Sequence, residues 1–176
     1  DLREYFVAKR GVAKKLSPAA QVLVIYSIYK HRSLFGDTMS MTEWAEELGY
    51  TKMTMTRAFR ELRSILEHEE DLNTVHGRRL WESVRPYLRT PVKRRRYYHV
   101  ECDSPPRGSF LSGDSALSHY TMIAESEYLT ICMSGTKWKT FQERWKPEEL
   151  SRPEPDSIGI EVWRYVPERL ANNGVA

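Results

Sequence analysis

The sequence predicts an α+β protein in two parts, a helical first part and a small mixed second part. The stretch Thr42–Leu66 places apolar residues at the three- and four-residue spacing of amphipathic helices, on both sides of a glycine. Later in the chain, Tyr128–Met133 and Ile158–Tyr165 are rich in strand-forming residues. Between these regions Asp103–Gly108 contains adjacent prolines and a glycine, so we expect the domain boundary there.

Composition excludes several classes of protein. A chain of 176 residues with 40% apolar content can bury a core, so it does not belong to the disordered class. The apolar run Val22–Tyr29 is too short to span a bilayer, and no membrane segment is expected. Cys102 and Cys132 are far apart and form no C-x-x-C pair. We therefore expect buried thiols in a reducing, cytoplasmic compartment, with no zinc site and no disulfide.

Charge is distributed unevenly along the chain. The net charge is +3, but residues 52–100 have a net charge of +6 and residues 101–176 of −4. The excess of Lys and Arg falls in the second predicted helix and the segment after it, where a surface that faces phosphates would need it.

The first elements follow from start and stop signals. Residues 1–16 are basic and weakly periodic, and a short helix, a dimer-forming arm and a loose leader all fit them. Ser17 and Pro18 predict the start of a helix that ends near Lys30, with Ser17 as its cap. Thr38–Met41 is expected to form a small strand. Core positions of the helix are expected at Val22, Ile25, Tyr26 and Tyr29.

The stretch Thr42–Leu66 predicts two helices joined by a tight turn. Thr42 is the expected cap of a helix that ends at Leu48, Gly49 can take a left-handed conformation there, and Thr51 can cap the second helix. The apolar stripe of the second helix consists of Met55, Ala58, Phe59, Leu62, Ile65 and Leu66. Its opposite side consists of Met53, Thr56, Arg57, Arg60 and Ser64, which leaves Thr and Arg free to enter a groove.

The segment after Leu66 is expected to form a short β-hairpin. Leu72–Val75 fits a strand, His76 and Gly77 supply the turn, and Arg78 and Arg79 would project from its tip. An ordinary charged turn explains these arginines equally well. The next segment has helix-like spacing at Leu80, Trp81, Val84 and Leu88, and Pro86 predicts that this helix breaks near Arg85.

Four consecutive cations, Lys93–Arg96, precede Tyr97 and Tyr98. Such a block can contact the sugar–phosphate backbone of a nucleic acid. It can equally form a solvated strand edge on which cations discourage pairing between sheets. Both interpretations remain open at this point.

The second part predicts alternating helices and strands. Ser112–Ala124 should contain a capped helix, and Tyr128–Met133 a strand that ends in a Ser-Gly turn. Trp138, Phe141 and Trp145 recur at spacings of three and four, which fits a helix or an aromatic-lined loop. Ile158–Tyr165 should form a strand, and Pro167 should open a short helical turn.

The pattern from Glu43 to Leu62, E-x-x-x-x-L-G-x-T-x-x-T-x-T-R-x-x-x-x-L, resembles the reading head of winged helix-turn-helix transcriptional regulators of the broad MarR-like kind. The resemblance covers roughly the first hundred residues and implies a winged helix-turn-helix domain at 1–102 that includes the basic strand. It implies a dimeric repressor that binds a palindromic site in double-stranded DNA. A helical hairpin with a purely structural role is the alternative. The candidate DNA-binding residues are Thr51, Lys52, Met53, Thr54, Thr56, Arg57, Arg60, Arg78, Arg79, Lys93, Arg94, Arg95 and Arg96.

The segment SGDSALSHYTM, which begins at Ser112, is similar to the short Ser-Ala-Leu helix that follows the winged domain in AbiEi-type antitoxins. This similarity implies a regulator that represses its own operon and neutralises a toxin partner. Residues 109–176 would then be a small α+β domain for dimerisation, for binding an effector or for binding a protein partner.

Catalytic signatures are sparse. The five histidines form no H-x-x-x-H pair, and no phosphate-binding glycine motif occurs. His119 follows Ser115 by four residues, so a nucleophile–base pair on one helix face is conceivable, but a partly exposed structural histidine explains it more simply. We therefore expect a protein that is not an enzyme, with no catalytic residues, metal or cofactor.

Overall fold

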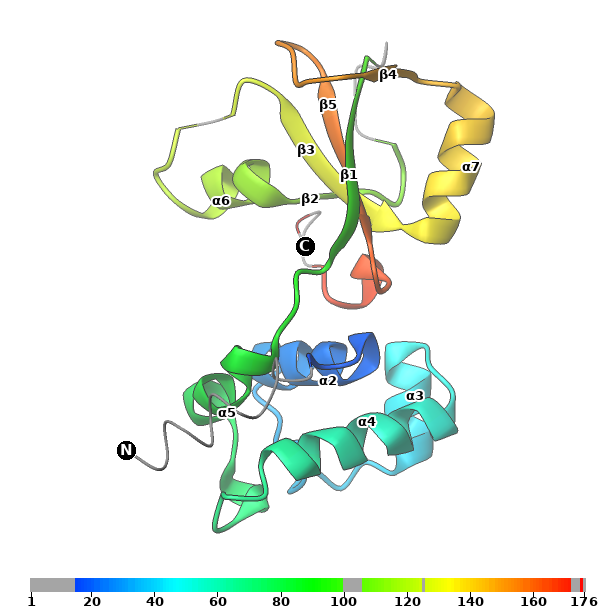
Figure 1. Cartoon of the computed structure of the whole chain (residues 1–176). Coiled ribbons are helices and arrows are strands. Elements are labelled where there is room, and N and C mark those ends of the chain that lie inside the picture. Colours follow the sequence, from blue (N-terminus) through cyan, green and yellow to red (C-terminus); the bar gives the residue numbers. More distant parts are fainter. Residues whose placement is uncertain (1–14, 100–105, 125, 172–174, 176) are drawn as a thin grey trace, which may run out of the picture. The chain divides into compact units, whose positions relative to one another are not determined.

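A computed structural model describes residues 15–99, 106–124, 126–171 and 175. The alternatives predicted for residues 1–16 therefore fall largely outside the described residues. The prediction for Cys102 falls wholly outside them. The chain divides into two compact units, residues 1–89 and 90–176 (Figure 1). The described part is a mixed α+β structure, with six α-helices and one mixed sheet of five strands.

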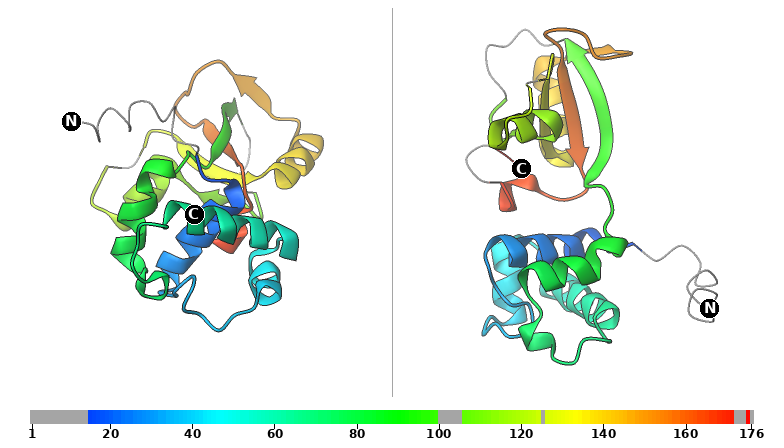
Figure 2. Two further views of the ribbon diagram at one scale, coloured as in Figure 1. Left: turned by 60° about the horizontal axis from the view of Figure 1, so that its bottom comes forward. Right: turned by 90° about the vertical axis from the view of Figure 1, so that its left-hand side faces the viewer.

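The first unit is helical throughout its described part. Its elements are α2 (Pro18–Tyr29), α3 (Met41–Leu48), α4 (Lys52–Ile65), the 3₁₀-helix η1 (Leu72–Thr74), α5 (Gly77–Val84) and the 3₁₀-helix η2 (Arg85–Tyr87). Helix α4 packs against α2 and α3, and α2 also packs against α5 (Figure 2). At the centre lies Trp44, which is fully buried and makes edge-on ring contacts with Tyr26 and Phe59.

Most of the predicted helix signals are confirmed. Ser17 caps α2 by accepting a hydrogen bond from the Ala20 N–H, and Pro18 is its first residue. Helix α3 begins two residues earlier than expected, because Ser40 rather than Thr42 is its cap. Ser40 and Glu43 form a reciprocal capping box, and the Ser40 N–H lowers the pKa of the Glu43 carboxyl by hydrogen bonding to it.

The two strands predicted for the first unit are wrong. Residues 38–40 form no strand, since the chain there leads directly into the capping box of α3. Residues 72–74 form η1, because the Asp71 carboxylate accepts a hydrogen bond from the Asn73 N–H and Thr74 donates to the Asp71 carbonyl. These side chains satisfy the backbone locally, so no β-hairpin wing forms among the described residues of this unit.

Helix α5 occupies the place of the expected return strand. The helix-like spacing seen in the sequence decides the structure, since Leu80 and Val84 are both fully buried. The predicted break near Arg85 is confirmed, because α5 passes there into η2, which contains Pro86.

The second unit is built on the sheet, with strand order β2-β3-β5-β1-β4. Its elements are β1 (Val92–His99), β2 (Phe110–Leu111), α6 (Gly113–Tyr120), β3 (Leu129–Ser134), α7 (Gly135–Trp145), β4 (Glu148–Leu150), β5 (Ile158–Trp163) and the 3₁₀-helix η3 (Pro167–Arg169). Strands β3 and β5 are parallel and are connected through α7, whereas β1 runs antiparallel to β5 and β4. Parallel neighbours need such a crossover connection.

The core of the second unit lies between α7 and the sheet. Trp138 and Phe141 project from α7 onto Ile131, Met133 and the buried residues of β5, with Tyr98 from β1. The aromatic residues Trp138, Phe141 and Trp145 are therefore on a helix, which resolves the choice between a helix and a loop. The basic strand belongs to this unit and not to the first domain as expected, because residues 92–98 pair with β5. The division between units falls at residues 89–90 rather than at 103–108.

Cys132 is buried in β3, as predicted. Burial, reinforced by the nearby Glu161 carboxylate, raises the pKa of its thiol to about 12. Within the described residues, no helix is both long and apolar enough to cross a bilayer.

Candidate nucleic-acid interface

The turn before α4 has the geometry that the sequence predicts. Gly49 has φ 70° and ψ 35°, a left-handed conformation that ends α3, and α4 begins three positions later at Lys52. Thr51 caps α4, since its hydroxyl oxygen accepts a hydrogen bond from the Thr54 N–H at 3.2 Å. The Thr51 and Thr54 hydroxyls are themselves 2.9 Å apart. The start of α4 is thereby fixed by its own side chains.

Helix α4 separates its apolar and polar residues cleanly. Met55, Ala58, Phe59 and Leu62 are buried in the first unit. The opposite face is exposed to solvent, and even the apolar Met53 on it is 64% exposed. The exposed residues among the predicted candidates are Thr51, Lys52, Met53, Thr56, Arg57 and Arg60, and Thr54 is half-buried beside them. The structure thus brings all the candidates of this helix together on one surface.

The cations of this face have no carboxylate partner among residues 15–99. Glu61, four residues after Arg57, would be the natural helical partner of that arginine, but its carboxylate accepts a hydrogen bond from the Ser17 N–H at 3.0 Å. Glu47 accepts a hydrogen bond from the Tyr26 hydroxyl, and Glu43 belongs to the capping box of α3. These three carboxylates thus have hydrogen-bond donors elsewhere, and Arg57 and Arg60, which form no ion pair with a described residue, are available for an external anion.

A hollow of about 450 Å³ lies beside this face. Residues of the loop before α3 and of α4 line it, including Thr56, Arg60 and Arg63. The Arg63 guanidinium lies 5.5 Å from the centre of the Phe35 ring, a cation–π distance. Sequence inspection missed Arg63 as a member of this surface, although its position three residues after Arg60 is the signal that would have identified it.

Arg78 and Arg79 do not lie at a hairpin tip. Both are in the first turn of α5, and both are engaged within the unit. Arg78 pairs with Glu82 at 2.8 Å, and Arg79 pairs with Glu69 at 2.6 Å. A hydrogen bond from Ser83 and the charge of Arg79 lower the pKa of the Glu69 carboxyl. Of the two interpretations left open by the sequence, an ordinary charged surface fits these two arginines better.

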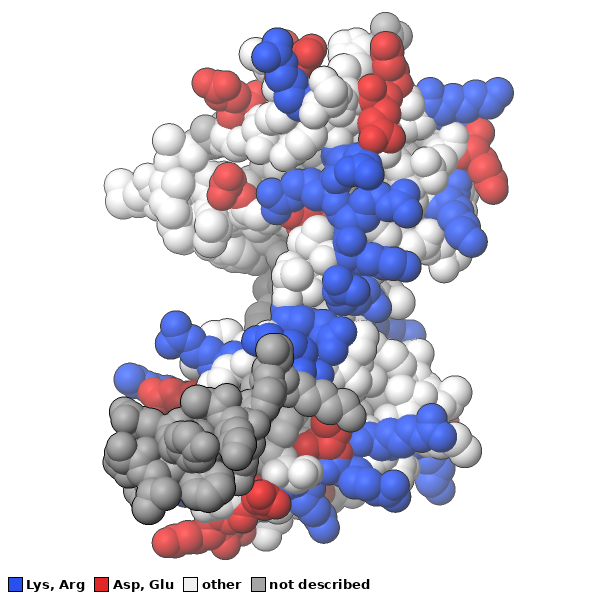
Figure 3. Space-filling model, in the orientation of Figure 1, with Lys and Arg blue, Asp and Glu red and all other residues white. Residues whose placement is uncertain are grey.

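The four cations of β1 are exposed, and their side chains gather over that strand (Figure 3). Two of them are paired: Arg95 donates to Glu161 from its Nε at 2.8 Å, and Arg96 lies 2.9 Å from Glu149. Within the described residues, Lys93 and Arg94 have no ion pair. Glu161 is only 2% exposed, and its second oxygen accepts a hydrogen bond from the Trp163 indole at 3.1 Å.

Glu161 lies in the segment Ile158–Tyr165, which the sequence predicts only as a strand. The signal that could have identified it is a single carboxylate in an otherwise uncharged strand, next to a strand rich in arginine. In the fold, Arg95 and Glu161 are directly opposite each other on β1 and β5.

The conceivable Ser115–His119 pair lies on the wall of an open cavity of about 630 Å³ in the second unit. Ser115 Oγ accepts a hydrogen bond from the Thr130 N–H at 2.9 Å, which attaches α6 to β3. The His119 ring packs edge-on against Tyr120, and among the described residues no hydrogen bond joins His119 to Ser115. No group of three or more His, Cys, Asp or Glu side chains suited to a metal ion occurs in the part that the structure describes. The arrangement does not have the hydrogen-bond geometry of an activated serine.

Comparison with known proteins gives no relative from which a role could be transferred: no family model matches the chain, and no curated protein or solved structure matches it significantly.

Proposed function

We propose that the protein is a double-stranded-DNA-binding transcriptional regulator that inserts α4 into the major groove. The observation that carries this proposal is the exposed face of α4, on which Lys52, Thr56, Arg57 and Arg60 lie side by side and form no ion pair with any carboxylate of the described residues. Free guanidinium groups on a helix that follows a capped tight turn are suited to guanine edges and phosphates.

The roles within this face follow from position. Arg57 and Arg60 are one helical turn or less apart and can reach base edges, where Arg binds guanine through two hydrogen bonds. Lys52 and the Thr51 and Thr54 hydroxyls are at the start of α4, where backbone N–H groups and the helix dipole favour a phosphate. Thr56 already donates its hydroxyl to the Lys52 carbonyl at 2.9 Å, so it would act on DNA as an acceptor.

The remaining candidates receive lesser roles. Lys93 and Arg94 are free of ion pairs within the described residues and would contact the DNA backbone. Arg78, Arg79, Arg95 and Arg96 are paired with carboxylates, and each would have to give up its partner to bind a phosphate. Because the described residues of the first unit form no wing, base recognition would depend on α4, and one such helix covers only a few base pairs. We therefore propose a two-fold dimer, acting as a repressor on a palindromic site.

The proposal is tested by selecting genomic DNA fragments that bind the full chain, at two salt concentrations. A sequence-specific regulator should enrich a palindromic motif at both salt concentrations. Enrichment should fall for Arg57→Ala and persist for Arg78→Ala, a matched control that removes an arginine already paired with Glu82. Binding that falls steeply with salt and enriches no motif would show non-specific nucleic-acid binding instead. Absence of DNA binding at both salt concentrations would refute the proposal.

A further inference from the structure

One large apolar side chain of α4 lies on its exposed face and outside the core. Met53 is 64% exposed, whereas Met55, Phe59 and Leu62 of the same helix are at most 8% exposed. Among the described residues of the first unit, Met53 is the most exposed large apolar side chain. Packing of the unit therefore does not explain why this position is apolar.

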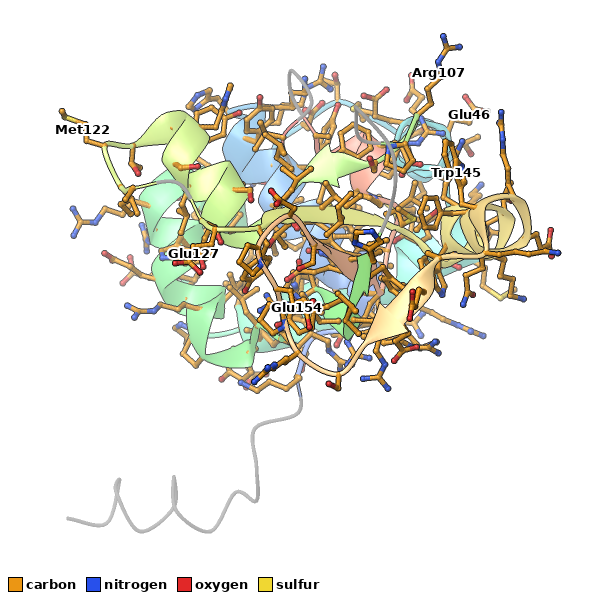
Figure 4. The ribbon with its side chains drawn as sticks, turned by 90° about the horizontal axis from the view of Figure 1, so that it is seen from above. Glu46, Arg107, Met122, Glu127, Trp145 and Glu154 are labelled. Carbon is orange, nitrogen blue, oxygen red and sulfur yellow. The ribbon has the colours of Figure 1, made fainter. Side chains whose placement is uncertain are left out.

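Some of the other exposed apolar side chains are partly covered by neighbours in the chain. The Lys30 ammonium lies 5.5 Å from the centre of the Tyr29 ring, and the Arg144 guanidinium 5.9 Å from that of Trp145. Trp145, labelled at the end of α7 in Figure 4, also stacks on Phe141 at 6.2 Å. A single exposed apolar residue is ordinary on a protein surface. What distinguishes Met53 is its position on α4.

Met53 lies near the middle of the face that contains the proposed DNA contacts. Thr56, Arg57 and Arg60 follow it by three, four and seven residues, and all three are exposed. At 3.6 residues per turn, these four side chains cover an arc of about 100°, and Met53 is within roughly 10° of its centre. An apolar side chain thus lies between the polar groups proposed to bind DNA.

The first turn of α4 fixes the position of Met53. It is the second residue of the helix, and Thr51 caps that end by accepting a hydrogen bond from the Thr54 N–H at 3.2 Å. In helix-turn-helix proteins, the N-terminal residues of the helix in the major groove contact the base edges. Met53 belongs to this part of α4, so a helix inserted in that way would bring its side chain to a base pair.

The thioether side chain of Met53 limits which group of a base pair it can contact favourably. It donates no hydrogen bond, and its sulfur is only a weak acceptor. Against the polar edge of a G·C pair it would leave donors and acceptors without partners, which costs free energy. Thymine, in contrast, presents an apolar methyl group in the major groove. Contact between the two removes apolar surface of both from water.

We infer that Met53 contacts a thymine methyl group and makes that position of the DNA site specific for thymine. The inference rests on the proposed function, because it requires α4 to enter the major groove. Met53 and Arg57 are about 6 Å apart along the helix axis, and successive base pairs are about 3.4 Å apart. The thymine therefore lies within about two base pairs of a guanine bound by Arg57, once in each half-site.

The test measures the affinity of the full chain for its selected DNA motif, by fluorescence anisotropy at one salt concentration. Each thymine of a half-site is replaced in turn by uracil, which pairs with adenine in the same way and lacks only the methyl group. One replacement should weaken binding about fourfold, the effect of roughly one buried methyl group. That thymine should lie next to, or two base pairs from, the guanine that Arg57→Ala no longer selects.

Three variants assign the methyl contact to Met53. Met53→Gln keeps the length of the side chain but makes it polar, and should bind the thymine and uracil duplexes with equal affinity. Met53→Leu stays apolar and should retain the preference for thymine. The matched control is Trp81→Gln, which changes another exposed apolar side chain of the first unit, on α5, and should leave the preference unchanged. Circular dichroism of each variant verifies that it is folded.

Two results would overturn the inference while the proposed function stands. One is a selected motif in which no replacement of thymine by uracil weakens binding of the wild-type chain. The other is a preference for thymine that Met53→Gln leaves unchanged, since another group would then contact the methyl. A chain that selects no DNA motif at all would refute the proposed function, and the role of Met53 with it.

Discussion

Helix α4 and strand β1 are both rich in cations, but their cations are in different electrostatic surroundings. On α4, Arg57 and Arg60 face solvent and form no ion pair with a described residue, and Glu43, Glu47 and Glu61 accept hydrogen bonds from other groups. On β1, Arg95 and Arg96 each have a carboxylate from a neighbouring strand. The position of an Arg or Lys in a basic run of sequence therefore does not predict whether it is free of an ion pair. What decides it is where the fold places Asp and Glu.

The largest expected effect concerns the buried carboxylate of Glu161. Arg95→Met removes its charged partner and leaves, among the described residues, the Trp163 indole to hydrogen bond with it. Because a buried charge without a counter-ion is strongly destabilising, we expect a loss of about 3 kcal/mol in the free energy of unfolding, measured by urea denaturation. Arg94→Met, at the adjacent exposed position, should change stability by less than about 0.5 kcal/mol. If the two substitutions lowered the free energy of unfolding equally, the ion pair with Glu161 would not distinguish Arg95 from Arg94.

The next effect concerns the free cations of α4. Arg57→Ala and Arg60→Ala should each weaken specific DNA binding by about 1 to 3 kcal/mol, because each removes a contact to a base edge or phosphate. Replacing a cation that contacts phosphate should also reduce the slope of log affinity against log salt by about 1. Arg96→Ala serves as the control, since its guanidinium is occupied by Glu149. If Arg96→Ala weakened binding as much as Arg57→Ala, β1 would have to be included in the DNA-reading surface.

A smaller effect concerns the turn that sets the position of α4. Gly49→Ala forces a side chain into the left-handed conformation at φ 70° and should cost about 1 kcal/mol of stability. Gly135→Ala is the matched control, because a side chain there would meet its nearest neighbour, Val162, only at 4.0 Å. Thermal melting should separate the two variants. A neutral Gly49→Ala would show that the turn is not needed in this geometry.

The last effect is confined to high pH and concerns Glu47, whose carboxylate accepts a hydrogen bond from the Tyr26 hydroxyl. Burial, followed by the hydrogen bond to Glu47, raises the pKa of Tyr26 to about 12 from an ordinary value of 10.0. A raised pKa means that the folded state holds the phenolic proton more tightly. The resulting stability is therefore complete below pH 10 and is lost as pH rises from 10 to 12. Tyr26→Phe should flatten the decline in stability over that interval, measured by urea denaturation at several pH values. An unchanged decline would mean that other groups cause it.

Local signals in the sequence were sufficient where one residue type meets a backbone requirement. Gly49 ends α3, Thr51 caps α4, and Pro86 falls where α5 gives way to η2. They failed at Leu72–Val75, where the apolar and β-branched residues suggested a strand. There Asp71 satisfies the backbone through its side chain, and the burial of Leu80 and Val84 makes the following residues helical. A strand also needs a second strand to pair with, and the local sequence does not show whether the fold supplies one.

The sequence by itself determined helices α2, α3 and α4, the turn between α3 and α4, and which side of α4 is apolar. Spacing and capping are local properties, and they act within a few residues along the chain. Only the tertiary structure decided which cations are free, because Arg95 meets Glu161, and Glu61 meets Ser17, across long separations in sequence. It also assigned the basic strand to the second unit, since pairing with β5 requires residues far away in the chain. An electrostatic surface depends on distances in space, and these exist only in the folded protein.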